Sequence, residues 1–259
     1  MTSTADRATT LLGLHTDPAL LTLVNVWDVA SARVVARTEG SRAIATASHS
    51  IAAAHGYEDG ERIPRDLMLE VVGRIVEAVD LPVTADLEAG YADAGETVRR
   101  AIGLGVVGCN IEDELKPVSE AAAAVASVMR AAEAEGVPDF VLNARTDAFL
   151  EAADPSSDEV LADAITRGRA YLDAGAPVVF VPGRVAEEQV VALVDAFGPH
   201  RLTMLPFPGC PPLGRLQELG VARVSFGPFP QWVAMTALQQ MVEGVTRGEG
   251  PPEGTQPMT

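Results

Sequence analysis

The stretch PVTADLEAGYAD, residues 82–93, has the composition of a buried strand that ends in acidic residues. Its first half is short and almost wholly apolar, which is typical of parallel strands covered on both faces. Its second half places Asp86, Glu88 and Asp93 where the strand ends. These carboxylates indicate either an acidic surface turn or a metal site at the mouth of a barrel.

Seven further apolar runs share this form. They are TLVNVWD from residue 22, AIATAS from 43, GCNIED from 108, FVLNARTD from 140, PVVFVPG from 177, RLTMLPFP from 201 and RVSFGP from 223. Segments with helical spacing separate them, for example RDLMLEVVGRIVEAV from residue 65. Eight strands alternating with helices predict an α/β fold, a (β/α)8 TIM barrel. The alternative is a doubly wound open sheet, but NVWDVASARVV lacks the glycine fingerprint expected after its first strand.

The chain length of 259 residues and the hydrophobic content of 47% suit one large domain. We expect a single barrel domain over residues 1–247, with a frayed N-terminal segment, MTSTADRATT, and a flexible tail over residues 248–259. The helical segment QWVAMTALQQMVEGV follows the eighth strand. Its apolar residues exceed what one barrel face needs, which favours a role in oligomerisation; they are Trp232, Val233, Met235, Leu238 and Met241.

Charge and cysteine content narrow the classes of partner. A formal charge of -17 repels nucleic acid and anionic membrane surfaces. The apolar runs are too short to span a bilayer, and no signal peptide is apparent. Cys109 and Cys210 lie far apart in sequence and form no CxxC pair. These features predict a reduced, cytoplasmic protein that acts on small molecules.

Polar residues follow most of the predicted strands, at the end where barrels carry their active sites. They are Asp28, Ser48, Asp86, Glu88, Glu112, Asp113, Arg145, Asp147 and Arg184. Strand alternation predicts that Asp86 and Glu88 share a face, as do Arg145 and Asp147. Converging acids repel one another unless a cation lies among them. Because Mg²⁺ prefers oxygen ligands, Asp86, Glu88 and Glu112 predict a Mg²⁺ site, with Mn²⁺ as the alternative.

An ordered set of motifs resembles a known family. NVWDVASA, TASHSIAAAHGYEDGE, VTADLEAGYAD, NIEDE, NARTDA and LQELGVARVSFGP occur in this order over residues 22–240. The set resembles the isocitrate lyase and phosphoenolpyruvate mutase superfamily. The resemblance implies a (β/α)8 barrel with Mg²⁺ at the strand ends. It also implies chemistry that makes or breaks carbon–carbon or carbon–phosphorus bonds next to a 2-oxo acid or its enolate.

The resemblance further implies roles for individual residues. Asp86, Glu88 and Glu112 match metal-site acids that act directly or through water, and Asp59 matches an aspartate near the metal and the reacting group. Arg145 matches an arginine that contacts the substrate, and Asp147 matches an acid that often holds it. Ser48, with the backbone at His49 and Ser50, matches a loop that cradles a substrate carboxylate or phosphonate. Trp27 and Asp28 match the end of the first strand, which also belongs to the substrate site.

The chain departs from the isocitrate-type lyases in one loop. Those enzymes carry a catalytic cysteine after the corresponding strand, whereas this chain reads NIEDELKPVSEAA, which is short and lacks cysteine. Lys116, Tyr91 and His49 are therefore the candidate acids near the barrel mouth. Lys116 either closes over the substrate or is a solvated surface residue, and His49 either donates to the substrate or fills space. Cys109 is expected in the core, whereas a structural or functional role for Cys210 stays open.

Taken with the resemblance, the sequence predicts a Mg²⁺-dependent lyase that cleaves or forms a carbon–carbon bond next to a 2-oxo or 2-hydroxy carboxylate, through a metal-stabilised enolate. A carbon–phosphorus mutase or hydrolase acting on a phosphonate is the first alternative, and a hydrolase or decarboxylase of oxaloacetate-like acids is the second. A barrel that binds a metabolite without converting it is the alternative from another class. The resemblance also implies a homodimer or homotetramer, assembled through the late helix.

Overall fold

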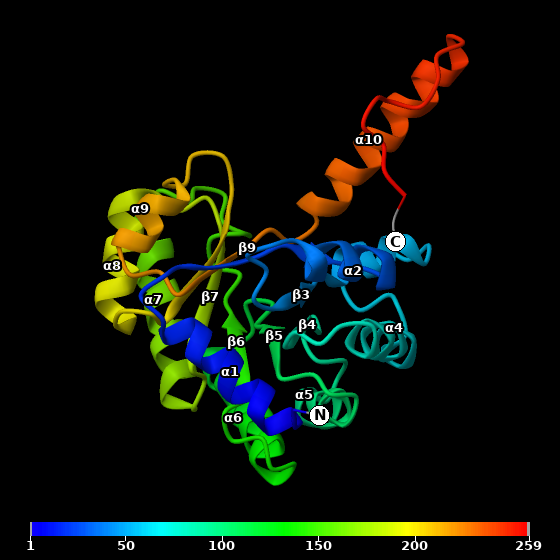
Figure 1. The fold of residues 1–259 in the computed structure, drawn as a ribbon. Helices are drawn as coiled ribbons and strands as arrows, with labels where there is room; N and C mark the ends of the chain where they lie inside the picture. Colours follow the sequence, from blue (N-terminus) through cyan, green and yellow to red (C-terminus); the bar gives the residue numbers. More distant parts are fainter. Residues whose placement is uncertain (1, 258–259) are drawn as a thin grey trace.

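Parallel strands close into a barrel in the computed structural model, which describes residues 2–257 (Figure 1). The strands are β1 (Leu21–Leu23), β2 (Asn25–Val26), β3 (Ile44–Thr46), β4 (Val83–Asp86), β5 (Gly108–Glu112), β6 (Val141–Arg145), β7 (Val178–Gly183), β8 (Leu202–Pro206) and β9 (Arg223–Ser225). Their order in the sheet is β1-β9-β8-β7-β6-β5-β4-β3-β2. The two ends of this sheet, β1 and β2, are joined by Val24 alone. The predicted TIM barrel is therefore confirmed, its first strand being split into two pieces, and the open-sheet alternative is wrong.

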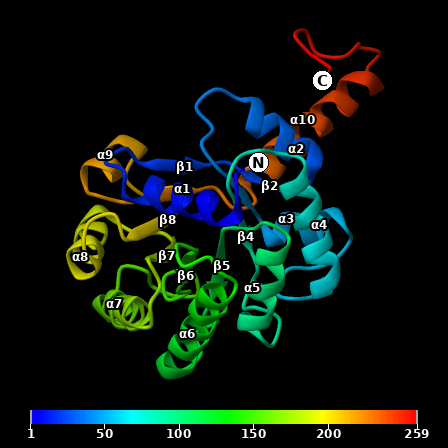
Figure 2. The same cartoon turned by 60° about the horizontal axis from the view of Figure 1, so that its bottom comes forward.

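Helices surround the strands on the outside, as the two views show (Figures 1 and 2). They are α1 (Thr4–Thr16), α2 (Val29–Arg37), α3 (Ser48–Ala54), α4 (Arg65–Glu77), α5 (Ala94–Gly103), α6 (Val118–Ala134), α7 (Asp158–Asp173), α8 (Glu187–Phe197), α9 (Leu213–Glu218) and α10 (Phe229–Thr246). The strands are buried along nearly their whole length because one face lines the barrel and the other packs on helices. This arrangement brings the carboxyl ends of all the strands to one rim.

The N-terminal segment differs from the prediction. Residues expected to fray form α1, which begins with a capping box in which Ser3 and Asp6 exchange hydrogen bonds. Ala8, Leu11 and Leu14 on this helix are buried. A Cβ atom added to Gly108 would lie 2.9 Å from Leu11 Cδ2, so the absent side chain makes room for the helix. A capped first turn and a buried apolar stripe explain why the segment is helical despite its polar composition.

The C-terminal helix α10 projects away from the barrel (Figure 1). Its first turn contacts α3, where the Gln231 side-chain amide donates to the Ser50 carbonyl oxygen at 2.9 Å. Further along, Val233 and Leu238 are 70% and 53% exposed. None of the helices within residues 2–257 combines the length and apolar character needed to cross a membrane. The helix ends at Thr246, and residues 248–257 contain neither helix nor strand; Met258 and Thr259, at the end of the predicted tail, lie outside the described residues.

Candidate active site

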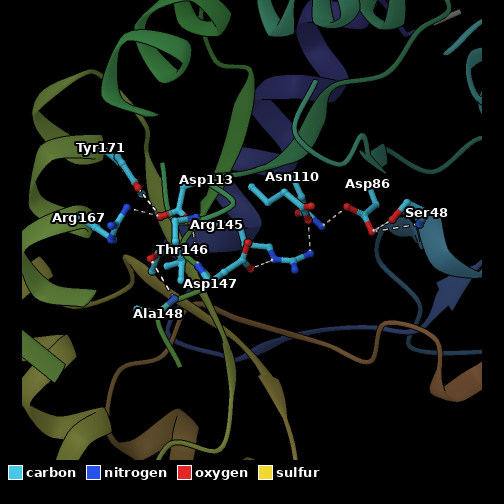
Figure 3. A network of polar contacts seen from close by, with 12 residues as sticks. Ser48, Asp86, Asn110, Asp113, Arg145, Thr146, Asp147, Ala148, Arg167 and Tyr171 are labelled. Atoms are coloured by element: carbon cyan, nitrogen blue, oxygen red, sulfur yellow. Dashed lines mark hydrogen bonds and ion pairs between the residues drawn. The ribbon is translucent and has the colours of Figure 1, made fainter. Parts of the chain in front are cut away.

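Asp86 lies at the end of β4, between Ser48 and Asn110 (Figure 3). Its Oδ2 atom accepts hydrogen bonds from the backbone N–H and the hydroxyl of Ser48, at 3.0 and 2.9 Å. The Asn110 side-chain amide lies 3.4 Å from its Oδ1 atom. The backbone N–H of Asp86 donates to the Thr46 hydroxyl at 2.9 Å. These bonds orient a half-buried carboxylate, which is the arrangement that a metal-site acid requires.

A chain of amide and hydroxyl side chains lies below Asp86 inside the barrel, and the sequence interpretation missed it. Asn143 donates to Asn110 at 2.8 Å and accepts a hydrogen bond from the Thr203 hydroxyl. Asn25 donates to the Thr46 carbonyl oxygen at 2.8 Å. A signal was present: Asn110 and Asn143 each stand two residues before a strand-end charge, on the same face of otherwise apolar strands.

Glu88 departs from the predicted strand alternation. β4 ends at Asp86, and Glu88 has a φ of 54°, so the two side chains are not successive members of one strand face. The Glu88 carboxylate accepts hydrogen bonds from the Glu61 backbone N–H and, at 3.0 Å, from the Tyr91 hydroxyl. Burial raises the pKa of Glu88 to about 7, and the charges of Asp59 and Asp86 add to that shift.

Arg145 links two acids at the end of β6 (Figure 3). Its Nη1 atom lies 2.5 Å from Glu112 Oε2, and its Nε atom lies 2.6 Å from Asp147 Oδ1. The predicted pairing of Arg145 with Asp147 is therefore present. Burial raises the pKa of Glu112 to about 8, although the Arg145 charge opposes the shift. Burial would lower the pKa of Arg145, but the carboxylates of Glu112 and Asp147 outweigh it and raise that pKa.

Asp113, next to Glu112, has buried partners of its own and, among the described residues, joins the Arg145 network only through the Asp147 backbone (Figure 3). Its Oδ2 atom accepts hydrogen bonds from the Tyr171 hydroxyl at 2.6 Å and from Arg167 Nη1 at 3.2 Å. Its Oδ1 atom accepts from the backbone N–H groups of Leu115 and Asp147, at 3.0 and 3.1 Å. Arg167 Nη1 also donates to the Lys116 carbonyl oxygen at 2.8 Å. This network fixes the short turn after β5, which has no cysteine loop.

The barrel mouth contains a cavity of about 180 Å³. Five of the predicted site residues line it: Ser48, His49, Asp59, Asp86 and Arg145. The His49 ring meets the Trp232 ring edge-on at 6.0 Å. Within residues 2–257, His49 Nδ1 is buried without a hydrogen-bond partner.

Other predicted residues lie away from this cavity. Glu112 and Lys116 line a neighbouring cavity of about 280 Å³, which Arg145 also lines, and Lys116 Nζ lies 2.5 Å from Glu114. Tyr91 lines a surface recess, and its hydroxyl already donates to Glu88.

Three residues predicted to bind substrate have local structural roles. The Asp28 carboxylate caps α2 through bonds from Ser31, and the Trp27 backbone N–H also donates to the Ser31 hydroxyl. Ser50 is buried beneath α10, where its carbonyl oxygen accepts from Gln231.

The donor set fits Mg²⁺ in its chemistry. Asp59 and Asp86 line the mouth and offer hard oxygen atoms, whereas Zn²⁺ would favour His or Cys. Within residues 2–257 no group of three or more acidic, His or Cys side chains converges on one point. Mg²⁺ keeps several waters and takes one or two carboxylates directly, a requirement that Asp86 and Asp59 on the cavity lining could meet.

The cysteines lie apart from the polar side of the mouth. Cys109 is fully buried, and burial raises the pKa of its thiol. Cys210 is half-buried, and its Sγ atom lies 3.5 Å from the Gly183 carbonyl oxygen. Cys109 is thus a core residue, as predicted from its place in a strand.

Known proteins resemble this chain over most of its length. The family model for phosphoenolpyruvate phosphomutase matches residues 11–246. The crystal structure of a phosphonomutase candidate from Burkholderia cenocepacia J2315 superposes with a TM-score of 0.87 and 43% identity, covering 93% of this chain and 99% of that one.

Two curated proteins extend the comparison. An uncharacterized protein of Mycobacterium tuberculosis is 31% identical over 240 residues, 91% of this chain and 88% of its own. The 2-methylisocitrate lyase of Escherichia coli K12 is 28% identical over 84% of this chain and 77% of its own. The match to the family model and these alignments agree with the ordered motifs and the closed barrel, and the chain therefore belongs to the phosphoenolpyruvate phosphomutase family, within the isocitrate lyase and phosphoenolpyruvate mutase superfamily.

Proposed function

We propose that the protein is a Mg²⁺-dependent lyase that cleaves or forms a carbon–carbon bond next to a 2-oxo or 2-hydroxy carboxylate. The observation that carries this proposal is the pairing of a fixed carboxylate, Asp86, with a guanidinium, Arg145, on the lining of one small cavity. Mg²⁺ bound at such a site can stabilise the negative charge of an enolate. Family membership supports this class of chemistry.

The protein side chains have separate tasks in this proposal. Asp86 holds the metal in a position that Ser48 fixes. Arg145 binds the substrate carboxylate in a fork geometry, and Glu112 and Asp147 keep its guanidinium oriented. His49, with its unpartnered Nδ1, offers a further hydrogen bond at the same wall of the cavity.

A carbon–phosphorus enzyme is the second candidate, favoured by the 43% identity to the phosphonomutase candidate. A panel of 2-oxo acids, 2-hydroxy acids and phosphonates separates the two, monitored for pyruvate, glyoxylate, oxalate and phosphate with and without Mg²⁺. Release of a carbonyl product that depends on Mg²⁺ supports the lyase, and release of phosphate supports the second candidate. A third candidate is a hydrolase or decarboxylase of oxaloacetate-like acids. Hydrolysis or decarboxylation of oxaloacetate in the same panel would indicate this candidate. If nothing in the panel is turned over while one of these acids binds, the barrel is a non-catalytic binding protein.

We further propose that α10 assembles the chain into a homodimer or homotetramer. Apolar side chains that a monomer would leave in water support this: Val233, Leu238, Val242 and Val245 on α10 are each more than half exposed. Light scattering at micromolar concentration should give a multiple of 27.1 kDa. Leu238→Glu should shift the mass toward that of the monomer. A parent protein that already has the monomer mass would contradict the proposal.

A further inference from the structure

The lining of the mouth cavity divides into two arcs around the barrel. Polar side chains come from the arc β2 to β6 and include Asn25, Asp59, Asp86 and Arg145. The opposite arc, built by β7, β8 and the segments after β6, β8 and β9, is apolar. Its lining residues are Leu150, Phe180, Pro182, Leu205, Phe207 and Pro228. The metal-side acids and the apolar wall therefore face each other across a cavity of about 180 Å³.

The apolar wall offers little to a charged group. Within the described chain, Arg145 is the single Lys or Arg side chain on the cavity lining, and it belongs to the polar arc. Arg184, at the end of β7, is exposed outside the cavity. The backbone N–H groups of Phe226 and Gly227, beside this wall, already donate to Asn25 Oδ1 at 2.7 and 2.8 Å. Ser225 supplies one hydroxyl at the boundary between the arcs.

Burying an unpaired carboxylate against such a wall is strongly unfavourable, whereas an alkyl or aromatic group is stabilised there by its removal from water. Phe180 and Leu205 are 4% and 8% exposed, so this part of the wall is closely packed, whereas Leu150 lies at the rim. One guanidinium on the polar arc can pair with one substrate carboxylate.

We infer that the substrate is a monocarboxylate: a 2-oxo or 2-hydroxy acid whose opposite end is an uncharged alkyl or aromatic group lying on the apolar wall. This inference rests on the proposed function, because it assumes that the oxo acid end binds beside Asp86 and Arg145. It disfavours substrates with a second carboxylate or a phosphonate at the far end.

Two five-carbon acids of equal length test the inference. 2-Oxopentanoate and 2-oxoglutarate differ in that a methyl group replaces the terminal carboxylate. Their dissociation constants are measured by calorimetry in the presence of Mg²⁺. Oxalate serves as the probe of the metal end, which is the part of the cavity beside Asp86 and Arg145. We expect 2-oxopentanoate to bind at least tenfold more tightly than 2-oxoglutarate, and oxalate to bind in a Mg²⁺-dependent manner.

A substitution in the wall sharpens the test. Leu150 is 38% exposed at the rim, so Leu150→Arg can place a cation there without burying it. This variant should lower the preference for 2-oxopentanoate at least tenfold. Leu213, which is 39% exposed on α9, supplies the matched control, and Leu213→Arg should leave the preference unchanged. Oxalate binding by both variants shows that the metal end is intact.

The outcomes are distinguishable. If oxalate binds with Mg²⁺ but 2-oxoglutarate binds the parent as tightly as 2-oxopentanoate, the monocarboxylate inference is wrong and the proposed function stands. If Leu213→Arg changes the preference as much as Leu150→Arg, a general charge effect explains the result and the wall has no role in selection. If oxalate fails to bind with Mg²⁺, the proposed function fails and the inference falls with it.

Discussion

Two acidic clusters lie on either side of Arg145 and differ in how their charges are satisfied (Figure 3). On one side, the Asp113 carboxylate accepts four hydrogen bonds, among them one from Tyr171 and one from Arg167. On the other side, Glu112 alone among Asp59, Asp86, Glu88 and Glu112 makes an ion pair within the described residues, with Arg145, which also pairs with Asp147. Acidic side chains thus have two roles: Asp113 accepts a full set of hydrogen bonds that stabilise the fold, whereas the acids around Asp86 form a site with few positively charged partners.

The difference teaches how to separate structure from function among strand-end acids. A carboxylate with a full set of buried partners stabilises the fold, and its removal leaves those partners unsatisfied. Burial raises the pKa values of Glu88 and Glu112, neighbouring acids add to the shift, and such a site gains from a cation. The following experiments test this division, from the largest expected effect to the smallest.

Asp86→Ala should abolish most activity while the protein stays folded. We expect kcat/KM to fall at least ~1,000-fold, about 4 kcal/mol, because the metal loses its direct carboxylate. Initial rates and circular dichroism measure the two effects. Asp195→Ala, which removes an exposed acid on α8, should change neither. An Asp86→Ala enzyme that keeps a tenth of its activity would remove Asp86 from the metal site.

Asp113→Ala should lower the free energy of unfolding by about 3–5 kcal/mol, because it leaves the buried Tyr171 hydroxyl without its acceptor and removes the buried carboxylate that pairs with Arg167. Urea denaturation measures the loss. Asp163 pairs with the same Arg167 at 2.7 Å, but its side chain is 45% exposed, so Asp163→Ala should cost less than about 1 kcal/mol. Equal losses from the two substitutions would contradict the structural role assigned to Asp113.

The metal-free protein should lose stability as pH rises from about 5 to 8. Glu88 and Glu112 have folded-state pKa values of about 7 and about 8, above their ordinary value of 4.5. Both groups hold their protons more tightly in the folded chain. Their contribution is therefore complete below pH 4.5 and is lost as pH rises through 7 to 8.

The expected slope is about 1.4 kcal/mol per pH unit for each group that has ionised only in the unfolded chain. Urea denaturation in EDTA at several pH values measures it, and saturating Mg²⁺ should reduce the slope. Glu88→Gln should remove part of the slope, whereas Asp163→Ala should leave it unchanged. A stability that rises over this pH range would show that Glu88 and Glu112 do not have raised pKa values in the folded chain.

Tyr91→Phe should slow turnover about tenfold, because the hydroxyl orients Glu88 at 3.0 Å and acts on the metal end through that residue. A hydroxyl that itself transfers a proton would cost ~100-fold or more. The pH dependence of kcat/KM separates the two roles, since loss of the Glu88 contact should shift the acidic limb. Tyr57→Phe, at a tyrosine that is 38% exposed, serves as the control.

Strand positions and the acids at their ends were predictable because they depend on local patterns. Each of the eight apolar runs contains a strand, and Asp86, Glu112 and Arg145 end β4, β5 and β6. Hydrophobic periodicity reports burial over a few residues, and parallel strands bring their carboxyl ends together whatever the loops contain. These strand ends are rich in carboxylate oxygens and poor in histidine, so the sequence alone also favoured Mg²⁺ over Zn²⁺.

The sequence by itself thus determined the barrel, the rim that carries the site and the kind of ligand atoms there. The tertiary structure decided which of those atoms are available. Asp113 meets Tyr171 across 58 positions of the chain, and Glu88 leaves the strand face through a positive φ, which no local periodicity encodes. The apolar wall likewise combines residues from separate strands. Side-chain partnerships over such separations depend on how the barrel closes, and that closure is a property of the whole chain.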